Sequence, residues 1–313
     1  MDVLESLLDG PRARGAFLLR SVMDPPWSLR IRDESPLTVV AMVRGWAWLL
    51  PDEGAPHRLA AGDVAVVRGP DHYTMADDPA TAPTVVISPG QVCTRVSDGA
   101  HLAEEWDLGV RTWGADPDGA TVMLTGTYEH AGEISRPLLS ALPGVITLTA
   151  ADWDTPLVSL LAEEIVRDHP GQRAVLDRLL DVLLITALRT WFGKQRDRAP
   201  AWYRAQGDPV VGKALQLLQN APAHPWTVAK LAAEAGVSRA ALARRFTELI
   251  GEPPMSYLTN WRLALAADLL CQPDVTIGAV ARQVGYSTAF ALSAAFKRER
   301  GISPQQHRQL ATG

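Results

Sequence analysis

Residues 227–257 have the sequence TVAKLAAEAGVSRAALARRFTELIGEPPMSY, and residues 276–307 have the sequence TIGAVARQVGYSTAFALSAAFKRERGISPQQH. The second stretch repeats the first, with one extra residue in its middle. Pairs separated by 49 positions are Thr227/Thr276, Leu231/Val280, Ala232/Ala281, Gly236/Gly285 and Ser238/Ser287. Pairs separated by 50 positions are Phe246/Phe296, Gly251/Gly301 and Pro254/Pro304. The same local structure is therefore expected twice.

Each copy predicts two helices joined by a tight turn. A Thr caps the first helix, a Gly suited to a left-handed turn ends it, and a Ser (Ser238 or Ser287) caps the second helix. A small residue, Ala232 or Ala281, lets the two helices approach closely, and spaced Leu and Phe side chains hold the second helix to a core. This pattern is typical of a helix-turn-helix unit.

The face of the second helix that points away from the core carries small and basic residues, which can enter a DNA major groove without collision. In the first copy the candidate DNA contacts are Ser238, Arg239, Ala240, Ala243 and Arg244. In the second copy they are Ser287, Thr288, Ala289, Ser293, Lys297 and Arg298. A plain helical bundle with a solvated charged face is the alternative for one unit, and two aligned copies favour DNA. Arg244 is expected to be a principal base or phosphate contact.

The residues between the copies, PMSYLTNWRLALAADLLCQP, predict one long helix. Pro254 suits a first helical position and Pro273 lies beyond the end, which leaves about seventeen residues, or roughly 25 Å. A rod of that length can hold two recognition helices about one DNA turn, roughly 34 Å, apart. One chain is thus expected to bind two successive grooves of a promoter or operator.

The residues before the repeat show two different patterns of apolar residues. From Pro25 to Pro89 short β-branched and aromatic runs alternate with turn residues, which predicts closely spaced strands. Beyond Asp154, apolar residues three and four apart predict two helices. The expected fold is α+β and multidomain. Its predicted parts are a β-barrel domain at 1–152, a helical hairpin at 153–192, a linker at 193–209 and an all-α domain at 210–313.

The C-terminal third resembles the DNA-binding domain of AraC/XylS-type transcriptional regulators. Residues 277–308 closely match the signature of the second helix-turn-helix unit in that family. Two residues depart from it: His307 stands where Tyr is usual, and Ala294 stands where a polar or basic residue is common. With several alanines on its second helix, the second unit is expected to contribute mostly backbone and methyl contacts, and the first unit most of the specificity.

The N-terminal part resembles the cupin-type sensor domains that many such regulators carry. The stretch GDVAVVRGPDHYTM places Gly62, Asp63, Gly69 and His72 as in the second half of a small cupin motif. The first half offers only His57, so the usual metal-ligand set is incomplete. Three interpretations of His57 and His72 stay open: a metal site, structural histidines, or hydrogen bonds to an effector. No metal and no cofactor are expected.

Trp46 and Trp48 share one face of an extended strand, so both point into the barrel or both point out. Core packing and the wall of a small-molecule pocket are both open interpretations. With His57 and His72, these residues are the candidate ligand-binding set.

The net charge of −5 divides unevenly along the chain. Residues 208–313 contain eleven Lys and Arg against seven Asp and Glu, a net +4, whereas residues 1–207 contain 19 against 28, a net −9. A basic piece on an acidic body indicates nucleic acid as a partner. The acidic residues 1–207 can also hold the basic domain in an arrangement that cannot bind DNA. In this model the linker is the hinge, and binding of a small-molecule effector releases the domain.

Other features narrow the function. The sequence has no apolar run of the roughly eighteen residues that a membrane helix needs and no secretory signal, so a cytoplasmic protein without a membrane partner is expected. No phosphate loop, HExxH, GxSxG or paired CxxC is present, so an enzyme is not expected. The family resemblance implies instead a regulator, namely an activator that can contact RNA polymerase. The alternative is a metal-dependent cupin enzyme fused to a DNA-binding domain.

A wide apolar face on the second helix of the hairpin predicts assembly. Its members are Leu176, Leu179, Leu180, Leu183, Leu184, Ala187, Leu188 and Trp191. Packing against the barrel and dimerisation both explain this face, and both can hold together. A homodimer through residues 155–192 is expected.

Overall fold

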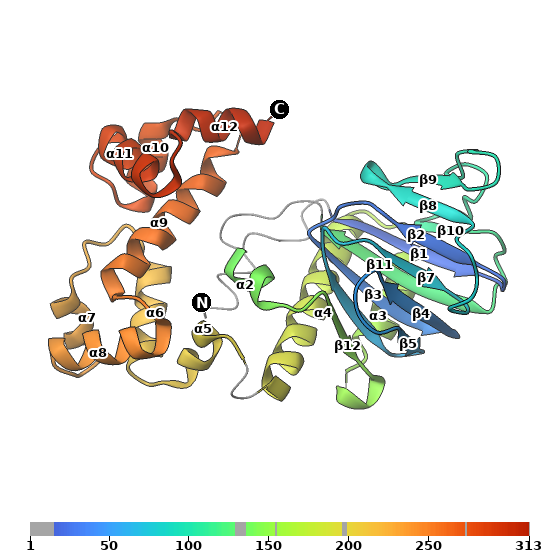
Figure 1. Ribbon diagram of the computed structural model, residues 1–313, viewed down its shortest axis with the longest axis horizontal. Coiled ribbons are helices and arrows are strands. Elements are labelled where there is room, and N and C mark those ends of the chain that lie inside the picture. The colour runs from blue at the N-terminus through green and yellow to red at the C-terminus, as the bar shows by residue number, and fades with distance from the viewer. Residues whose placement is uncertain (1–15, 129–135, 154, 196–198, 273, 313) are drawn as a thin grey trace. The chain divides into compact units, whose positions relative to one another are not determined.

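The computed structural model describes residues 16–128, 136–153, 155–195, 199–272 and 274–312. The chain forms two compact units, one made of 11–131 and 138–194 and the other chiefly of 195–313. The first unit is rich in strands and the second is helical (Figure 1). The α+β fold class is thereby confirmed.

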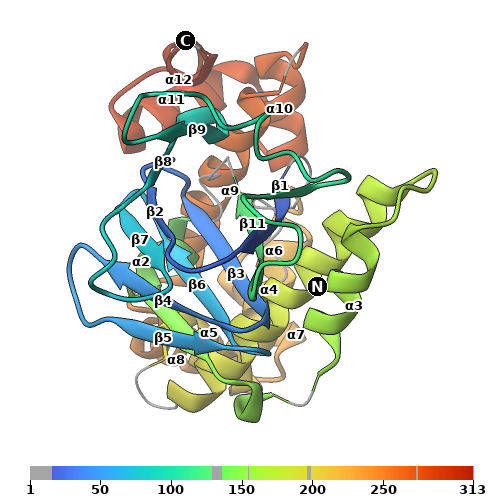
Figure 2. The same ribbon diagram turned by 90° about the vertical axis from the view of Figure 1, so that its right-hand side faces the viewer.

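The strands of the first unit build two six-stranded sheets, drawn face to face in Figure 2. One sheet has the order β10-β1-β11-β3-β6-β12 and the other has the order β5-β4-β7-β2-β8-β9. The strands are β1 (Phe17–Met23), β2 (Ser28–Ile31), β3 (Leu37–Arg44), β4 (Trp46–Pro51), β5 (His57–Ala60), β6 (Val64–Arg68), β7 (Tyr73–Ala76), β8 (Val85–Ser88), β9 (Val92–Arg95), β10 (Thr112–Gly114), β11 (Thr121–Tyr128) and β12 (Val145–Leu148). Short 3-10 turns are η1 (Pro89–Gln91) and η2 (Ala150–Asp152).

The space between the sheets is filled by apolar side chains. Inward residues such as Met42, Leu49 and Met75 are almost fully buried and form one cluster with Trp27 and Trp113. Close-packed side chains of this kind stabilise a β domain through burial of apolar area. The barrel interior is therefore a packed core.

Trp46 and Trp48 lie on the outer face of β4. The intervening Ala47 and Leu49 are fully buried in the core, whereas Trp46 is 47% exposed and the Arg58 guanidinium lies 5.7 Å from its ring centroid. The two tryptophans do share one face, as expected. That face points away from the core, so core packing of the two rings is wrong, and their part in a ligand pocket stays a prediction.

Among the described residues of this part of the chain, one helix lies between β11 and β12, and two follow β12. They are α2 (Arg136–Ala141), α3 (Leu157–Ile165) and α4 (Gln172–Gln195). The leucine-rich face of α4 packs against the β domain, because Leu180 abuts Gly126 of β11 and is fully buried. The Tyr128 hydroxyl of the same strand donates a hydrogen bond to the Asp181 carboxylate of the same helix at 3.5 Å. Packing against the barrel is confirmed; dimerisation through the hairpin stays a prediction.

The second unit consists of short helices around one long helix. They are α5 (Ala201–Arg204), the 3-10 turn η4 (Ala205–Gly207), α6 (Val211–Asn220), α7 (Val228–Glu234), α8 (Arg239–Ile250), α9 (Pro254–Leu270), α10 (Ile277–Val284), α11 (Ala289–Arg300) and α12 (Pro304–Thr312). The predicted seventeen-residue spacer is α9, which begins at Pro254; Pro273 lies outside the described residues. The stretch 193–209, where the sequence predicts a linker, contains the end of α4, α5 and η4.

No helix in the described part of the chain has both the length and the apolar character that a bilayer crossing requires.

The close contact between α4 and β11 gives a stability prediction. Gly126→Ala places a methyl group against the buried Leu180 side chain and is expected to lower the free energy of unfolding of the β unit by about 1–3 kcal/mol through overpacking. Gly193→Ala, in the last turns of α4 with open space around it, is the control and is expected to stabilise by about 0.5–1 kcal/mol. Urea denaturation measures both, and equal midpoints for the two variants contradict the packing.

Candidate nucleic-acid interface

The first helix-turn-helix unit consists of α7 and α8. Thr227 accepts a hydrogen bond from the Lys230 amide at 3.2 Å, and Ser238 accepts one from the Ala241 amide at 3.2 Å, so both predicted N-caps are confirmed. Gly236 has a φ of +69°, which supplies the left-handed turn between the helices. Leu242 and Phe246 are fully buried and hold one side of α8 to the domain core.

The second unit, α10 and α11, repeats this arrangement with one difference. Thr276 caps α10, but the cap of α11 is Thr288, whose hydroxyl accepts from the Ala291 amide at 3.0 Å. Ser287, the expected cap, lies one residue earlier in the turn. The extra residue of the second copy therefore falls before the cap, and α8 and α11 correspond at an offset of 50 throughout.

His307 takes the place of the usual tyrosine without loss of a ring contact. Its imidazole meets the Phe296 ring edge to face at 5.4 Å between centroids. An aromatic contact of this geometry holds the start of α12 against α11. The departure from the family pattern is thus accommodated by a ring contact at a partly buried position.

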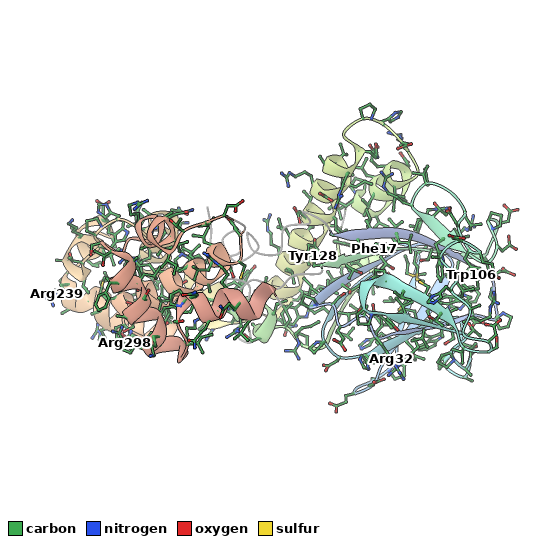
Figure 3. All side chains as sticks on the ribbon, turned by 90° about the horizontal axis from the view of Figure 1, so that it is seen from above. Phe17, Arg32, Trp106, Tyr128, Arg239 and Arg298 are labelled. Carbon is green, nitrogen blue, oxygen red and sulfur yellow. The ribbon has the colours of Figure 1, made fainter. Side chains whose placement is uncertain are left out.

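The outward faces of α8 and α11 carry the predicted DNA contacts. Exposed residues among them are Ser238, Arg239, Ala240, Arg244, Ser287, Thr288, Lys297 and Arg298, and partly buried ones are Ala243, Ala289 and Ser293. Figure 3 shows Arg239 and Arg298 projecting from the outside of the helical unit. The Ser293 hydroxyl donates to the Ala289 carbonyl at 2.8 Å, so this side chain is satisfied within its own helix.

The charged residues on these faces are loosely held. Arg244 lies 3.8 Å from Glu248, and both side chains are more than 60% exposed, so the pair is worth little in water. Arg298 pairs with its neighbour Glu299 at 2.8 Å. Arg239 and Lys297 form no ion pair within the described residues. These cations can therefore turn toward phosphates or base edges at small cost.

One arginine of α8 has a structural task that the sequence pattern did not reveal. Arg245 donates to Asp208 at 2.6 and 2.7 Å, and the same carboxylate accepts the Val210 and Val211 amides at the start of α6. Burial acts to raise the pKa of Asp208, but these hydrogen bonds outweigh it and the pKa is lowered. The contribution to stability is present above the unfolded pKa of Asp208 and is lost as pH falls through the folded pKa.

A second residue that the sequence pattern did not reveal, Arg262, contacts both helix-turn-helix units. Arg262 of α9 donates to the Pro222 carbonyl at 2.7 Å and to the His224 carbonyl at 3.0 Å, in the loop before α7. Its guanidinium also lies 6.0 Å from the Tyr286 ring centroid, at the turn of the second unit. A Cβ on Gly285 would meet the same loop and the same guanidinium. We name this set of contacts the Arg262 clamp.

In the β unit, three of the four residues that resemble a cupin motif, Gly62, Asp63 and Gly69, have structural roles. Gly62 has a φ of +88°, and the Asp63 carboxylate accepts the Ala60 and Ala150 amides at 2.8 Å each. Gly69 lies so close to the Ser35 carbonyl that no side chain fits there. Turn geometry alone explains this part of the motif.

His72 lines a cleft of about 340 Å³, whereas His57 lies outside its wall. The cleft is also lined by Asp52, Arg68 and Tyr73. Among the described residues no group of three or more His, Cys, Asp or Glu side chains is placed to hold a metal ion.

Polar groups at the cleft are unevenly satisfied. Arg30 holds Asp52 through two hydrogen bonds of 2.6 Å, and the hydrogen bond from Arg30 lowers the pKa of that carboxyl. The Arg68 Nε is buried and has no hydrogen-bond partner in the described part of the chain. A buried donor without a partner is costly.

Two helix-turn-helix units on one helical domain, behind a two-sheet β domain, define an AraC-type DNA-binding transcription regulator. Comparison with protein families gives the same result: a cupin family matches residues 2–193, and a helix-turn-helix domain family matches residues 231–310. The chain belongs to the AraC-type transcriptional regulators with an N-terminal cupin-like domain.

Several known proteins are similar along the whole chain. An AraC-like transcription regulator of Streptomyces antibioticus is 32% identical over 314 residues, 99% of either chain. The transcriptional regulator AlkR of Acinetobacter baylyi is 28% identical over 318 residues, again 99% of either chain. The crystal structure of the AdpA DNA-binding domain in complex with a target DNA aligns at 32% identity, over 33% of this chain and 93% of that one, with a TM-score of 0.31.

The exposed arginine on α8 gives a binding prediction. Arg244→Ala is expected to weaken operator binding by about 1–3 kcal/mol, because one charged contact to guanine or phosphate is lost. Fluorescence anisotropy at moderate salt measures the change. Arg189→Ala, an exposed arginine on α4, is the control. If Arg244→Ala binds the operator with wild-type affinity, Arg244 is not a principal DNA contact.

The Arg262 clamp gives a second prediction. Arg262→Met leaves the Pro222 and His224 carbonyls unpaired and is expected to lower the free energy of unfolding of the helical unit by about 1–3 kcal/mol. A loosened clamp is also expected to make binding less sensitive to one base pair inserted between the two operator halves. Arg282→Met, at an exposed arginine of α10, is the stability control. Wild-type sensitivity to the insertion in Arg262→Met contradicts the clamp.

Proposed function

We propose that α8 and α11 enter two successive major grooves of one duplex. The proposed contacts are Ser238, Arg239, Ala240, Ala243, Arg244, Ser287, Thr288, Ala289, Ser293, Lys297 and Arg298. The observation that carries this proposal is the Arg262 clamp, which ties the two units into one domain so that two recognition faces act together. Binding at promoters, contact with RNA polymerase, activation and a cytoplasmic location belong to the same proposal.

Selection of bound duplexes from random sequence by the full chain tests the proposal. The expected result is a bipartite site, with two blocks of preferred bases about one helical turn, roughly 10 base pairs, apart. A single block, or no enrichment at all, contradicts simultaneous binding by both units.

We propose that the β unit is a sensor, and that its effector binds in the cleft lined by His72. Arg68 and His72 line this cleft and carry N–H donors, which favours an effector with a hydrogen-bond acceptor such as a carboxylate or carbonyl oxygen. His57, Trp46 and Trp48 do not line this cleft, so we assign them no part in it. The regulators among the relatives support a sensor over a metal-dependent enzyme, and metal analysis of the purified protein distinguishes the two.

Regulation requires the effector to bind the DNA-competent and DNA-incompetent arrangements unequally. We propose that residues 193–209 act as the hinge between the sensor and the DNA-binding domain. Surface charges are screened within roughly 8 Å at physiological salt, so direct contact must dominate any restraint by the acidic body.

A fragment tests the sensor model. Residues 199–313 retain α5 and Asp208 and are expected to bind the operator without effector, whereas the full chain is expected to change its affinity when effector is added. Titration of both proteins with the same duplex measures this. Identical affinities under every candidate effector show that the β unit does not regulate binding.

We propose a homodimer through the hairpin, on a stripe that the barrel leaves uncovered. Val175 and Val182 of α4 are each 44% exposed, and Leu179 between them is partly buried. Their spacing of four and three residues places them on one side of the helix. The homodimer would use this outer stripe, because the predicted leucine face is occupied within the subunit.

Val182→Asp is expected to convert the dimer to a monomer, because an unpaired charge in an apolar interface is costly. Sedimentation at tens of micromolar measures the assembly. Ala174→Asp places the same charge on an exposed residue in the first turn of α4 and is expected to leave the dimer intact. A wild-type monomer, with and without DNA, removes the dimer model.

A further inference from the structure

The N-terminal turn of α11 carries a large apolar side chain that the sequence pattern did not mark as functional. Phe290 is 83% exposed. It directly follows Ala289, the first residue of the helix, and Thr288, which caps it. Scattered exposed apolar residues are common on proteins, so exposure alone means little. The position of Phe290 in the helix decides what it can contact.

Phe290 lies on the side of α11 that points away from the protein core. Successive residues turn by about 100°, so Phe290, Ala294 and Lys297 share one face, and the buried Leu292 and Phe296 occupy the opposite one. Ala294 is small and exposed, and Lys297 is exposed. The Phe290 ring therefore projects beyond the small Ala294 side chain, and the cation of Lys297 lies on the same face.

The corresponding residue of the first unit is Ala240, because α8 and α11 align at an offset of 50. The two recognition helices thus present different chemistry at equivalent positions. On α8, Arg239 and Arg244 flank a methyl group, and on α11 a phenyl ring stands where α8 has that methyl group.

We propose that Phe290 contacts the 5-methyl group of a thymine in the major groove. This inference rests on the proposed function, in which α11 enters a groove. Residues near the N-terminus of a recognition helix are the ones that meet base edges. The thymine methyl is an apolar feature that the other natural bases lack on their major-groove edges, and a phenylalanine can cover it.

The consequence is that the two halves of the operator differ in composition. The half bound by α8 contains guanines that arginine can recognise, and the half bound by α11 contains at least one thymine. This proposal replaces the expectation that the second unit contributes mostly backbone and methyl contacts. Both units contribute specificity, through hydrogen bonds in one and through apolar contact in the other.

Replacement of single thymines by deoxyuridine tests the proposal, since only the methyl group is removed. The operator is first selected with the full chain, and parallel selections with Arg244→Ala and Phe290→Ala show which half each helix recognises. At one thymine or more in the α11 half, the wild-type chain is expected to lose about fourfold in affinity, the equivalent of about 0.8 kcal/mol for one methyl. Phe290→Ala is expected to bind thymine and uracil duplexes equally.

Two controls separate the outcomes. Phe290→Leu keeps an apolar side chain and is expected to retain part of the methyl preference, and Leu310→Ala, at a 75% exposed residue of α12, is expected to retain all of it. Operator binding by the wild-type chain with no preference for thymine over uracil in the α11 half overturns the inference, though not the proposed function. A second result also overturns the inference. If Phe290→Ala binds DNA normally and keeps the full methyl preference but no longer supports transcription, the ring contacts a protein partner instead. Failure to bind any duplex refutes the proposed function itself.

Discussion

The hydrogen bonds from the Arg262 guanidinium to the Pro222 and His224 carbonyls constrain the whole DNA-binding domain. Helix α9 sets the length between the two recognition helices, but a rod alone does not set the angle between their faces. The clamp helps to set that angle, because it ties the loop before α7 to α9 and brings the guanidinium beside the Tyr286 ring at the turn after α10. In the proposed binding mode, two weak binding faces would thereby act as one, and the entropy cost of aligning them would be met during folding rather than on DNA.

The β unit is organised around a filled interior, so the proposed effector would have to bind at its margin. Met42, Leu49 and Met75 occupy the volume that an open barrel would leave for a ligand. The cleft that contains His72 lies at the ends of β4, β6 and β7, close to the turn that β12 follows. A molecule bound there touches loops as well as strands, and loops can change conformation at lower cost than a packed core.

Local features of the fold were predictable from the sequence, and non-local ones were not. Thr227, Ser238 and Thr276 cap helices by bonds that span three residues, so their pattern is visible in the sequence. The strand period places Trp46 and Trp48 on one face but does not say which face is inside, since that depends on the opposite sheet. Partners of Arg262 lie 38 and 40 residues away, so no local pattern marks them. The outward position of Phe290 could have been predicted from the sequence, because the helical period places it opposite Leu292 and Phe296.

In the proposed binding mode, the unequal faces of α8 and α11 would also give the bound complex a polarity. A protein with two identical recognition helices related by a two-fold axis fits its site equally well in either orientation. This chain presents a methyl group between two arginines on α8 and a phenyl ring at the equivalent position of α11, with α9 between the two helices. In the proposed binding mode a single chain would therefore fit its site in one orientation, and a promoter would dictate which side of the protein faces the start of transcription.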